Sequence, residues 1–477
     1  MQRLCATSMV VAVIIASTAG AAATARADAP PAGALSQLPG QAVCLATTNS
    51  DAPPDAGCTL LRTSATSRSC SNCLGNAVIS PEGLDLYLVD QGSNTLVHMR
   101  RDPATGQLAQ ALGTGGCISG SGRNGCARAR GIANGKRRKK GQPGLPTLRA
   151  VAISPDGRNV YVSASGRTDA VLAFGRDAST GALQQLSVRS GCIGVGISAC
   201  ARARAMQFNN RLLVSPDGAN VYVEMSRSPG QLAVLRRAGD GSLHQLAGKA
   251  GCLSGSKKSG CTKLGNPTED TLALSPDGKQ AYIASGEAND ISIYSRRPGT
   301  GALRLQRSCI AYQDTKPCGP TDTGQFISLR MSPDGSSLYL VEGVDDLVVG
   351  YARDPSTGSL TKLPAPFGCG RSTPCPDGLA VAESIAFTPD SQTAYYILAT
   401  GNGSGGGVIL YHHGADGSLT PFAAPFACVA AVATTCQPAP NLRVNEPSMV
   451  ISPDGRNAYP VGQETITAFA IAGPSGP

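Results

Sequence analysis

The nine residues SPDGRNVYV at 154–162 return almost unchanged as SPDGANVYV at 215–223 and SPDGKQAYI at 275–283. Looser copies are SPEGLDLYL (80–88), SPDGSSLYL (332–340), TPDSQTAYY (388–396) and SPDGRNAYP (452–460). The seven prolines are spaced by 74, 61, 60, 57, 56 and 64 residues, and a tyrosine stands six residues after each. Self-similarity at this period is typical of propellers and solenoids, so this repeat decides the fold.

Each copy has the sequence pattern of a four-stranded antiparallel sheet. The apolar run LRAVAIS (148–154) precedes a Pro-Asp-Gly turn, in which Pro presets φ, Asp bonds the backbone and Gly takes positive φ. The runs NVYVSAS and AVLAFGR follow, then a second turn, DASTG, and a short last strand, ALQQL. The pattern predicts an all-β protein, a seven-bladed β-propeller of four-stranded antiparallel blades.

The last copy shows how the ring would close. Its fourth strand is missing from ETITAFAIAGPSGP (464–477), but GALSQLPGQAVC (33–44) matches GALQQLSVRSGC (181–192). We therefore expect residues 34–38 to be the outer strand of the last blade. This arrangement would remove an exposed sheet edge and join the ring by hydrogen bonds.

The first 27 residues have the features of a signal peptide. Arg3 supplies a positive start, SMVVAVIIAS (8–17) is apolar, and ARA (25–27) is a small-residue cleavage site. We expect residues 28–477 to form a single propeller domain without a membrane span, secreted or periplasmic, and monomeric.

Cysteine usage fits an oxidising compartment. Removing Cys5 with the leader leaves sixteen of the 17 cysteines, an even number. Redox work by CSNC (70–73) and zinc binding are alternatives, but the motif lacks a helix start and histidine is almost absent nearby. We expect local disulfides in loops between blades: Cys44–Cys58, Cys70–Cys73, Cys117–Cys126, Cys192–Cys200, Cys252–Cys261, Cys309–Cys318, Cys369–Cys375 and Cys428–Cys436.

The formal charge of +9 is concentrated in one place. Between Pro103 and Pro155 there is no acid but nine basic residues, five of them in the insert NGKRRKKGQPG (134–144). Two hypotheses remain open for this insert. It is either a solvated loop or a tether to an anionic surface polymer or membrane surface. The residues concerned are Lys136, Arg137, Arg138, Lys139 and Lys140.

The SPDG…YV and DPATGxL motifs resemble those of the seven-bladed lactonase propellers, or YVTN-repeat proteins, which include 6-phosphogluconolactonase and carboxymuconate cyclase. The resemblance covers about residues 33–471. It implies a ligand site on the face that carries the cysteine loops and the loops after the tyrosine strands. The enzymatic members carry histidines just ahead of an inner strand. This chain has none there, since His98 and His412 are expected on third strands, His413 at the end of one and His244 on an outer strand.

Charged residues just ahead of the innermost strands should ring the channel mouth. The ligand-binding candidates are Arg149, Arg211, Asp270, Glu383 and Glu446. The loops after the second strands add Asp90, Glu224, Glu287 and Glu342. No phosphate loop, nucleophile elbow or zinc-ligand cluster occurs, so neither a cofactor nor a metal is expected.

Three functions remain in competition. The first is a non-catalytic protein that binds a ligand or surface through the cysteine-looped face. The second is a lactonase-type hydrolase or isomerase acting on a small sugar-acid lactone at the channel mouth, where acids and arginines could serve as base and oxyanion partner. The third is a structural cell-surface repeat protein. The missing histidines favour the first function, and we assign no catalytic residue.

Overall fold

The computed structural model describes residues 29–473 with gaps. The gaps are 41–43, 48–57, 64–73, 133–146, 166–168, 196–197, 207–208, 226–229, 257–259, 265–268, 286–289, 312–325, 343–346, 365–366, 369–378, 401–405, 432–434, 441, 443–447 and 463. The expected signal peptide and the basic loop 134–144 lie outside the described residues.

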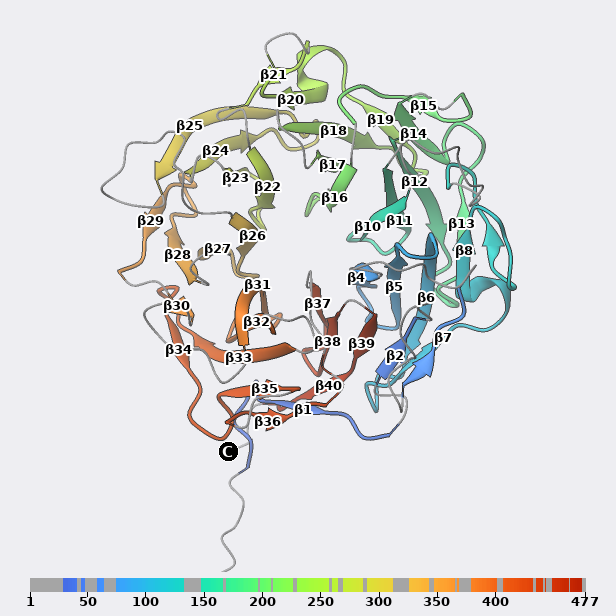
Figure 1. The fold of residues 1–477 in the computed structure, drawn as a ribbon. Coiled ribbons are helices and arrows are strands. Elements are labelled where there is room, and N and C mark those ends of the chain that lie inside the picture. Colours follow the sequence, from blue (N-terminus) through green and yellow to red (C-terminus); the bar gives the residue numbers. More distant parts are fainter. Residues whose placement is uncertain are drawn as a thin grey trace, which may run out of the picture.

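The described strands form seven sheets, which are arranged around a central opening (Figure 1). We name each sheet after its innermost strand. The β4 sheet contains β4 (Leu74–Ile79), β5 (Asp85–Asp90), β6 (Thr95–Arg101), β7 (Leu108–Gln110), β8 (Cys117–Ser119) and β9 (Ala127–Arg128). The β10 sheet contains β10 (Thr147–Ile153), β11 (Asn159–Ser165), β12 (Asp169–Arg176), β13 (Leu183–Gln185), β14 (Cys192–Val195) and β15 (Ala201–Arg202).

The next three sheets follow in chain order. The β16 sheet contains β16 (Asn209–Val214), β17 (Asn220–Met225), β18 (Gln231–Arg237), β19 (Leu243–Gln245), β20 (Cys252–Ser254) and β21 (Thr262–Lys263). The β22 sheet contains β22 (Glu269–Leu274), β23 (Gln280–Ser285), β24 (Asp290–Arg296) and β25 (Leu303–Ala311). The β26 sheet contains β26 (Phe326–Met331), β27 (Ser337–Glu342), β28 (Leu347–Arg353), β29 (Leu360–Lys362) and β30 (Phe367–Gly368).

The last two sheets bring the chain back to its start. The β31 sheet contains β31 (Leu379–Phe387), β32 (Thr393–Thr400), β33 (Gly406–His413), β34 (Leu419–Pro421), β35 (Cys428–Ala430) and β36 (Gln437–Pro438). The β37 sheet contains β37 (Ser448–Ile451), β38 (Asn457–Val461), β39 (Thr465–Thr467), β40 (Phe469–Ile471), β1 (Leu35–Gln37), β2 (Cys44–Ala46) and β3 (Thr59–Leu60). Helical structure among the described residues is limited to 3-10 turns such as η2 (Gly113–Gly116) and η3 (Gly248–Gly251), so the all-β propeller is confirmed.

The N-terminal strand closes the ring, as the sequence predicts for residues 34–38. β1 pairs antiparallel with β40, with Leu35 opposite Ile471 and Gln37 opposite Phe469. β2 adds to the same sheet by pairing with β39. The N-terminal segment therefore occupies hydrogen-bonding edges that the C-terminal strands would otherwise expose.

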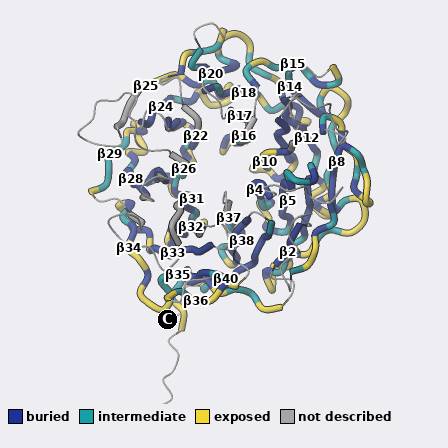
Figure 2. Tube along the Cα trace, viewed as in Figure 1, coloured by how far each residue is buried: buried dark blue, intermediate teal, exposed yellow. Residues whose placement is uncertain are grey.

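The hydrophobic core is divided into clusters that lie between neighbouring sheets. One cluster joins Tyr87 and Val89 of the β4 sheet to Val151 and Val162 of the β10 sheet. Another joins the β37 sheet back to the β4 sheet. The described clusters follow this pattern around the whole ring, and Figure 2 shows buried residues along the strands and exposed residues in the turns at the circumference. Burial of apolar surface between sheets therefore stabilises the ring.

A repeated hydrogen bond fixes the spacing of the sheets. The hydroxyl of each repeat tyrosine donates to a turn glycine carbonyl in the next sheet, for example Tyr87 to Gly181 at 2.6 Å and Tyr161 to Gly241 at 2.9 Å. The same bond spans the closure, from Tyr395 to Gly33 at 2.8 Å. The remaining pairs are Tyr222 to Gly301, Tyr282 to Gly358, Tyr339 to Gly417 and Tyr459 to Gly106. The tyrosine of SPDG…YV is thus explained by packing between sheets.

The cysteine segments differ from the expected loops. β14 pairs with the first half of β12, beyond the reach of the short outer strand β13, and β15 then pairs parallel to β14. Five sheets show this arrangement, and β2, β8, β14, β20 and β35 lie at the outer circumference (Figure 1). These segments therefore form strands where loops were expected, and β14 lies at the start of β12, on the same face as the loop that follows the tyrosine strand β11. The physical reason is that β13 leaves half of the β12 edge open, and the following segment covers it.

Five of the expected disulfides are confirmed, with Cα–Cα distances of 4.7 to 4.9 Å. They are Cys44–Cys58, Cys117–Cys126, Cys192–Cys200, Cys252–Cys261 and Cys428–Cys436. Each of the other three expected pairs includes a residue outside the described part of the chain. Disulfides are typical of proteins outside the reducing cytosol. No described helix could span a bilayer.

Candidate functional site

The mouth of the channel is shaped by a repeated β-bulge. The register slips near the start of the innermost strand in β10 between Leu148 and Ala150, in β22 between Glu269 and Thr271, and in β31 between Ala382 and Ser384. β4, β16 and β26 slip at the corresponding place. A bulge bends its strand and re-aims the bulged side chain. The end of the channel that carries these bulges is called the mouth face below.

Three of the five ligand-binding candidates are the bulged residues themselves, namely Arg149, Asp270 and Glu383. Each stands six residues before its turn proline, which explains why the sequence places them together. The structure describes only the backbone of Asp270 and Glu383. Glu446 and the basic run Lys136–Lys140 fall outside the described residues, so these candidates stay predictions.

Arg149 is the best-defined side chain of the mouth face. It is exposed, Nε donates to Ser165 Oγ at 3.1 Å, and Nη1 donates to Gln91 Oε1 at 2.9 Å. Gly75 lies against it, since a Cβ at Gly75 would stand 2.9 Å from the Arg149 carbonyl oxygen. Both hydrogen-bond partners of the guanidinium are neutral, so Arg149 presents a positive charge held in place by hydrogen bonds. Gln91 and Ser165 were not found from the sequence, because neither has a distinguishing motif.

Arg211 lies one residue beyond the bulge of its own strand. Its Nη1 donates to Thr271 Oγ1 of the next sheet at 2.8 Å, and Glu224 stands opposite it in the strand register. Glu224 is buried. Both charged residues were identified from the sequence, but the hydrogen bond from Arg211 to Thr271 was not predicted.

A second set of charges lies at the turn end of the sheets, where arginines at the ends of the third strands hold neighbouring sheets together. Arg237 Nη2 pairs with the turn carboxylate of Asp156 at 2.7 Å, and its Nε donates to the Tyr161 hydroxyl at 3.1 Å. The same contacts join Arg101 to Asp454, Arg296 to Asp217 and Arg353 to Asp277. The turn aspartates, expected to cap turns, therefore also bind the next sheet.

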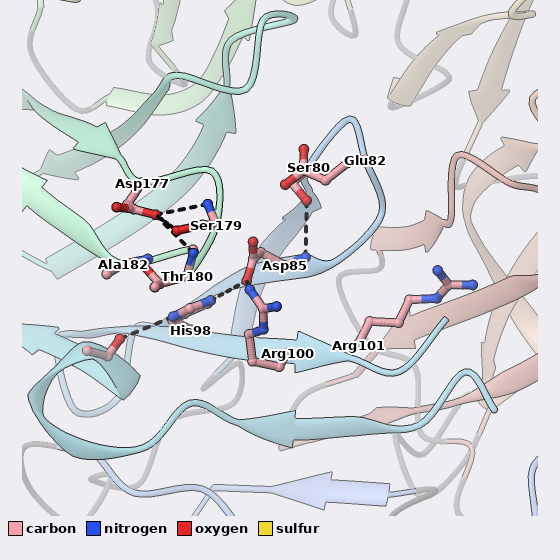
Figure 3. A network of polar contacts seen from close by, with 12 residues as sticks. Ser80, Glu82, Asp85, His98, Arg100, Arg101, Asp177, Ser179, Thr180 and Ala182 are labelled. Carbon is pink, nitrogen blue, oxygen red and sulfur yellow. Dashed lines mark hydrogen bonds and ion pairs between the residues drawn. The ribbon is translucent and has the colours of Figure 1, made fainter. Parts of the chain in front are cut away.

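The β4 sheet carries a denser version of this network (Figure 3). Asp85 is fully buried and accepts hydrogen bonds from His98 Nε2 at 2.7 Å and Arg100 Nη1 at 2.8 Å. Arg176 of the next sheet pairs with both Asp85 and Glu82. Burial raises the pKa of Asp85, but the hydrogen bonds and charges of His98 and Arg176 outweigh it and lower the pKa below the usual value. This network joins two sheets, and the side chains at its centre, Asp85, His98 and Arg176, are buried.

The histidines lie where the sequence places them. His98 is on β6, His412 and His413 end β33, and His244 is on the outer strand β19. His413 occupies the position that an arginine holds in most other sheets, and its Nδ1 bonds the Ser391 carbonyl at 2.7 Å. Within the described ranges no three His, Cys, Asp or Glu side chains are grouped as metal ligands would be.

No protein-family model and no curated protein matches this chain. Among solved structures it is similar to a putative 6-phosphogluconolactonase from Bacteroides uniformis, at 14% identity and a TM-score of 0.47, over 83% of this chain and 91% of that one. It is also similar to the periplasmic gluconolactonase of Pseudomonas aeruginosa, at 18% identity and a TM-score of 0.46, over 72% and 82%. A β-propeller domain from Myceliophteria thermophila matches at 12% identity and a TM-score of 0.48, over 85% and 98%. At these values the propeller assignment rests on the strand pairings of this chain.

Proposed function

We propose that this chain is an exported, seven-bladed propeller of the lactonase type that binds a small polar ligand at the mouth face without converting it. The observation that carries the proposal is the repeated bulge, which gives Arg149, Asp270 and Glu383 equivalent positions in three sheets. A bulge that re-aims side chains is common beside binding sites. The five disulfides support export.

The ligand class follows from the charges. A guanidinium whose protein partners are neutral favours a carboxylate, which it can bind through two parallel hydrogen bonds. Asp270, Glu383 and Glu446 would accept hydrogen bonds from hydroxyl groups, and Arg211 would add a second cation. A small sugar acid combines these features. The absence of a histidine ahead of any inner strand supports binding without turnover.

Gluconate is the probe, and calorimetry measures its binding to the wild type and to Arg149→Ala. Loss of one charge-assisted pair should weaken binding about tenfold or more. Arg158→Ala removes an exposed arginine from a turn at the other end of the channel and should leave binding unchanged. Equal binding by the wild type and Arg149→Ala would contradict the proposal, as would no binding by either.

The alternative is lactone hydrolysis, favoured by the presence of carboxylates at two bulges. Glu383 or Asp270 would activate water and Arg149 or Arg211 would hold the developing oxyanion. A carboxylate base would need its pKa raised by burial. We expect little turnover of gluconolactone by the wild type. Robust hydrolysis that disappears in Glu383→Ala or Asp270→Ala would make this alternative the function.

A further inference from the structure

A cavity lies in the channel wall, between Ser384, which follows the bulge of β31, and the turns at the other end of the channel. It encloses about 350 Å³, and it reaches the turn prolines Pro333 and Pro389. Its walls come from the innermost strands β26, β31 and β37, which stand side by side around the central opening (Figure 1). The side chains that matter are Arg330, Met331, Ala386, Phe387, Met449 and Ile451. The volume is within the range of small-molecule sites.

Arg330 is the one charged side chain among the described residues of this lining. Its described hydrogen bonding consists of a contact from Nη1 to the Leu329 carbonyl at 3.5 Å, which is longer than an ordinary N–H to O bond. A guanidinium has five N–H donors, and the charge is expensive to enclose unless it is paired. The donors of Arg330 are therefore available to a ligand in the cavity.

The electrostatic surroundings of Arg330 leave it in need of an anion. Burial, and to a smaller extent the positive charge of Arg211, lower the pKa of Arg330 to about 10, while the negative charge of Glu224 opposes them. Both the positive charge of Arg211 and the negative charge of Glu224 therefore act on Arg330. A bound anion would supply the missing negative charge, and a low dielectric would strengthen the contact.

Apart from the buried Ser384, the rest of the described lining is apolar. Met331, Met449 and Ile451 are half-buried and contribute thioether and aliphatic surface, and Ala386 leaves space between them. Methionine side chains adapt to ligands of irregular shape. A strongly hydrated ion such as a polyhydroxylated acid would lose its water here without replacement hydrogen bonds.

We propose that this cavity binds an amphiphilic organic carboxylate, with its carboxylate on Arg330 and its hydrocarbon part against Met331, Ala386 and Met449. The cavity extends from the turn end of the channel towards the mouth face, and it takes a different ligand class from the sugar acid proposed there. The guanidinium fork fits a carboxylate in two parallel hydrogen bonds, and the apolar wall selects the hydrocarbon part.

The test uses octanoate as probe and the full exported chain as protein, with binding followed by calorimetry. Arg330→Gln should weaken octanoate binding about tenfold or more, because a charge-assisted pair is lost. Arg330→Lys keeps the positive charge but loses the planar guanidinium group. Its affinity for octanoate should therefore lie between those of the wild type and Arg330→Gln. Arg456→Gln removes an exposed arginine at the same end of the channel and serves as the matched control.

Two further measurements separate this site from others. Ala386→Leu should reduce octanoate binding by filling the cavity without changing its charge, and it tests the proposal even if Arg330→Gln does not fold. Octanamide, which lacks the charge, should bind at least about tenfold more weakly than octanoate. Arg149→Ala should leave octanoate binding unchanged while it weakens gluconate binding.

The proposal is overturned if the wild type does not bind octanoate, if octanamide binds as well, or if Arg330→Gln and Ala386→Leu both bind like the wild type. Loss of octanoate binding in Arg149→Ala with retention in Arg330→Gln would place octanoate at the mouth face, and would equally overturn it. Failure of gluconate to bind leaves this test intact.

Discussion

The carboxylate of Asp85 accepts a hydrogen bond from Nε2 of His98 at 2.7 Å, while the other ring nitrogen of His98 lies 3.2 Å from the Gly115 carbonyl oxygen. These two contacts hold the imidazole ring between the second strand of its sheet and the turn that follows the outer strand. The ring also stacks on Tyr87 at 5.0 Å between centroids. The pair belongs to a buried ionic cluster that no other described sheet junction has. In the other six repeats the position of Asp85, four residues after the turn proline, is occupied by a neutral residue. These residues are Asn159, Asn220, Gln280, Ser337, Thr393 and Asn457.

We predict that Asp85→Asn lowers the free energy of unfolding by about 3 kcal/mol, because Arg176 loses one of two carboxylates in a buried site. Asp156→Asn breaks the corresponding ion pair at a half-exposed carboxylate and should cost less than about 1 kcal/mol. Urea unfolding compares the two. Equal losses in the free energy of unfolding would mean that breaking the buried Asp85–Arg176 ion pair costs no more than breaking the half-exposed Asp156–Arg237 pair.

Acid should weaken the ring through the same residue. The pKa of Asp85 is lowered in the folded state, so the unfolded chain binds its proton more readily, and stability is lost as pH falls through the folded pKa. The loss should begin below about pH 4, the ordinary aspartate range. Unfolding measured between about pH 5 and about pH 3 should show a shallower fall in Asp85→Asn than in the wild type. A parallel fall would contradict this assignment.

Gly181→Ala should destabilise the protein by about 2 kcal/mol or more, because its φ of +70° disfavours a side chain and a Cβ would stand 2.0 Å from Asp85 Oδ1. Gly239 is the control, since a Cβ there meets nothing within 4 Å. Thermal unfolding distinguishes the variants. If Gly181→Ala unfolds at the same temperature as Gly239→Ala, the close approach of Gly181 to Asp85 does not contribute to stability, and the prediction is wrong.

Deleting residues 28–43 should cause aggregation or a large loss of stability. The deletion removes β1, exposes the edge of β40 and removes the Gly33 carbonyl that accepts from Tyr395. Deleting only residues 28–30, of which 29 and 30 are exposed, should change little. Light scattering and thermal unfolding measure both outcomes. Unchanged unfolding of the longer deletion would refute closure of the ring by this strand.

Reduction should weaken the fold without abolishing the sheet pairing. Each disulfide closes a loop with a sequence separation of 8 to 14 residues, so each contributes about 2–3 kcal/mol by constraining the unfolded chain. Non-reducing peptide mapping checks the pairing, including the three pairs outside the described residues. Free thiols at most of these positions would contradict the proposed compartment.

The basic loop gives a prediction that is independent of the channel. If Lys136–Lys140 tether the protein, binding to polyphosphate should weaken steeply as salt rises, because exposed charges are screened. Replacing the run with Gly and Ser should abolish this binding and leave thermal unfolding unchanged. Polyphosphate binding that persists in the replaced variant would exclude the tether.

The sequence by itself determined the repeat, the all-β architecture, the closing strand and five local disulfides. These features are encoded locally: a Pro-Asp-Gly turn sets its own backbone, and two cysteines a few residues apart can reach each other. Position relative to the turn proline also placed Arg149, Asp270 and Glu383 in equivalent places, because the repeat fixes the register of every inner strand.

Only the tertiary structure decided how the sheets meet. The bonds from Tyr87 to Gly181 and from Tyr395 to Gly33 join residues 94 and 362 positions apart, and no local pattern specifies such partners. The cysteine segments lie at the circumference because the short strand β13 covers only the end of β12. The start of β12 is left open for β14 to pair with. The availability of Arg330 likewise depends on three strands converging around it: an arginine in FISLRM predicts a polar position, but only the closed ring gives it an apolar cavity and no carboxylate within hydrogen-bonding distance among the described residues.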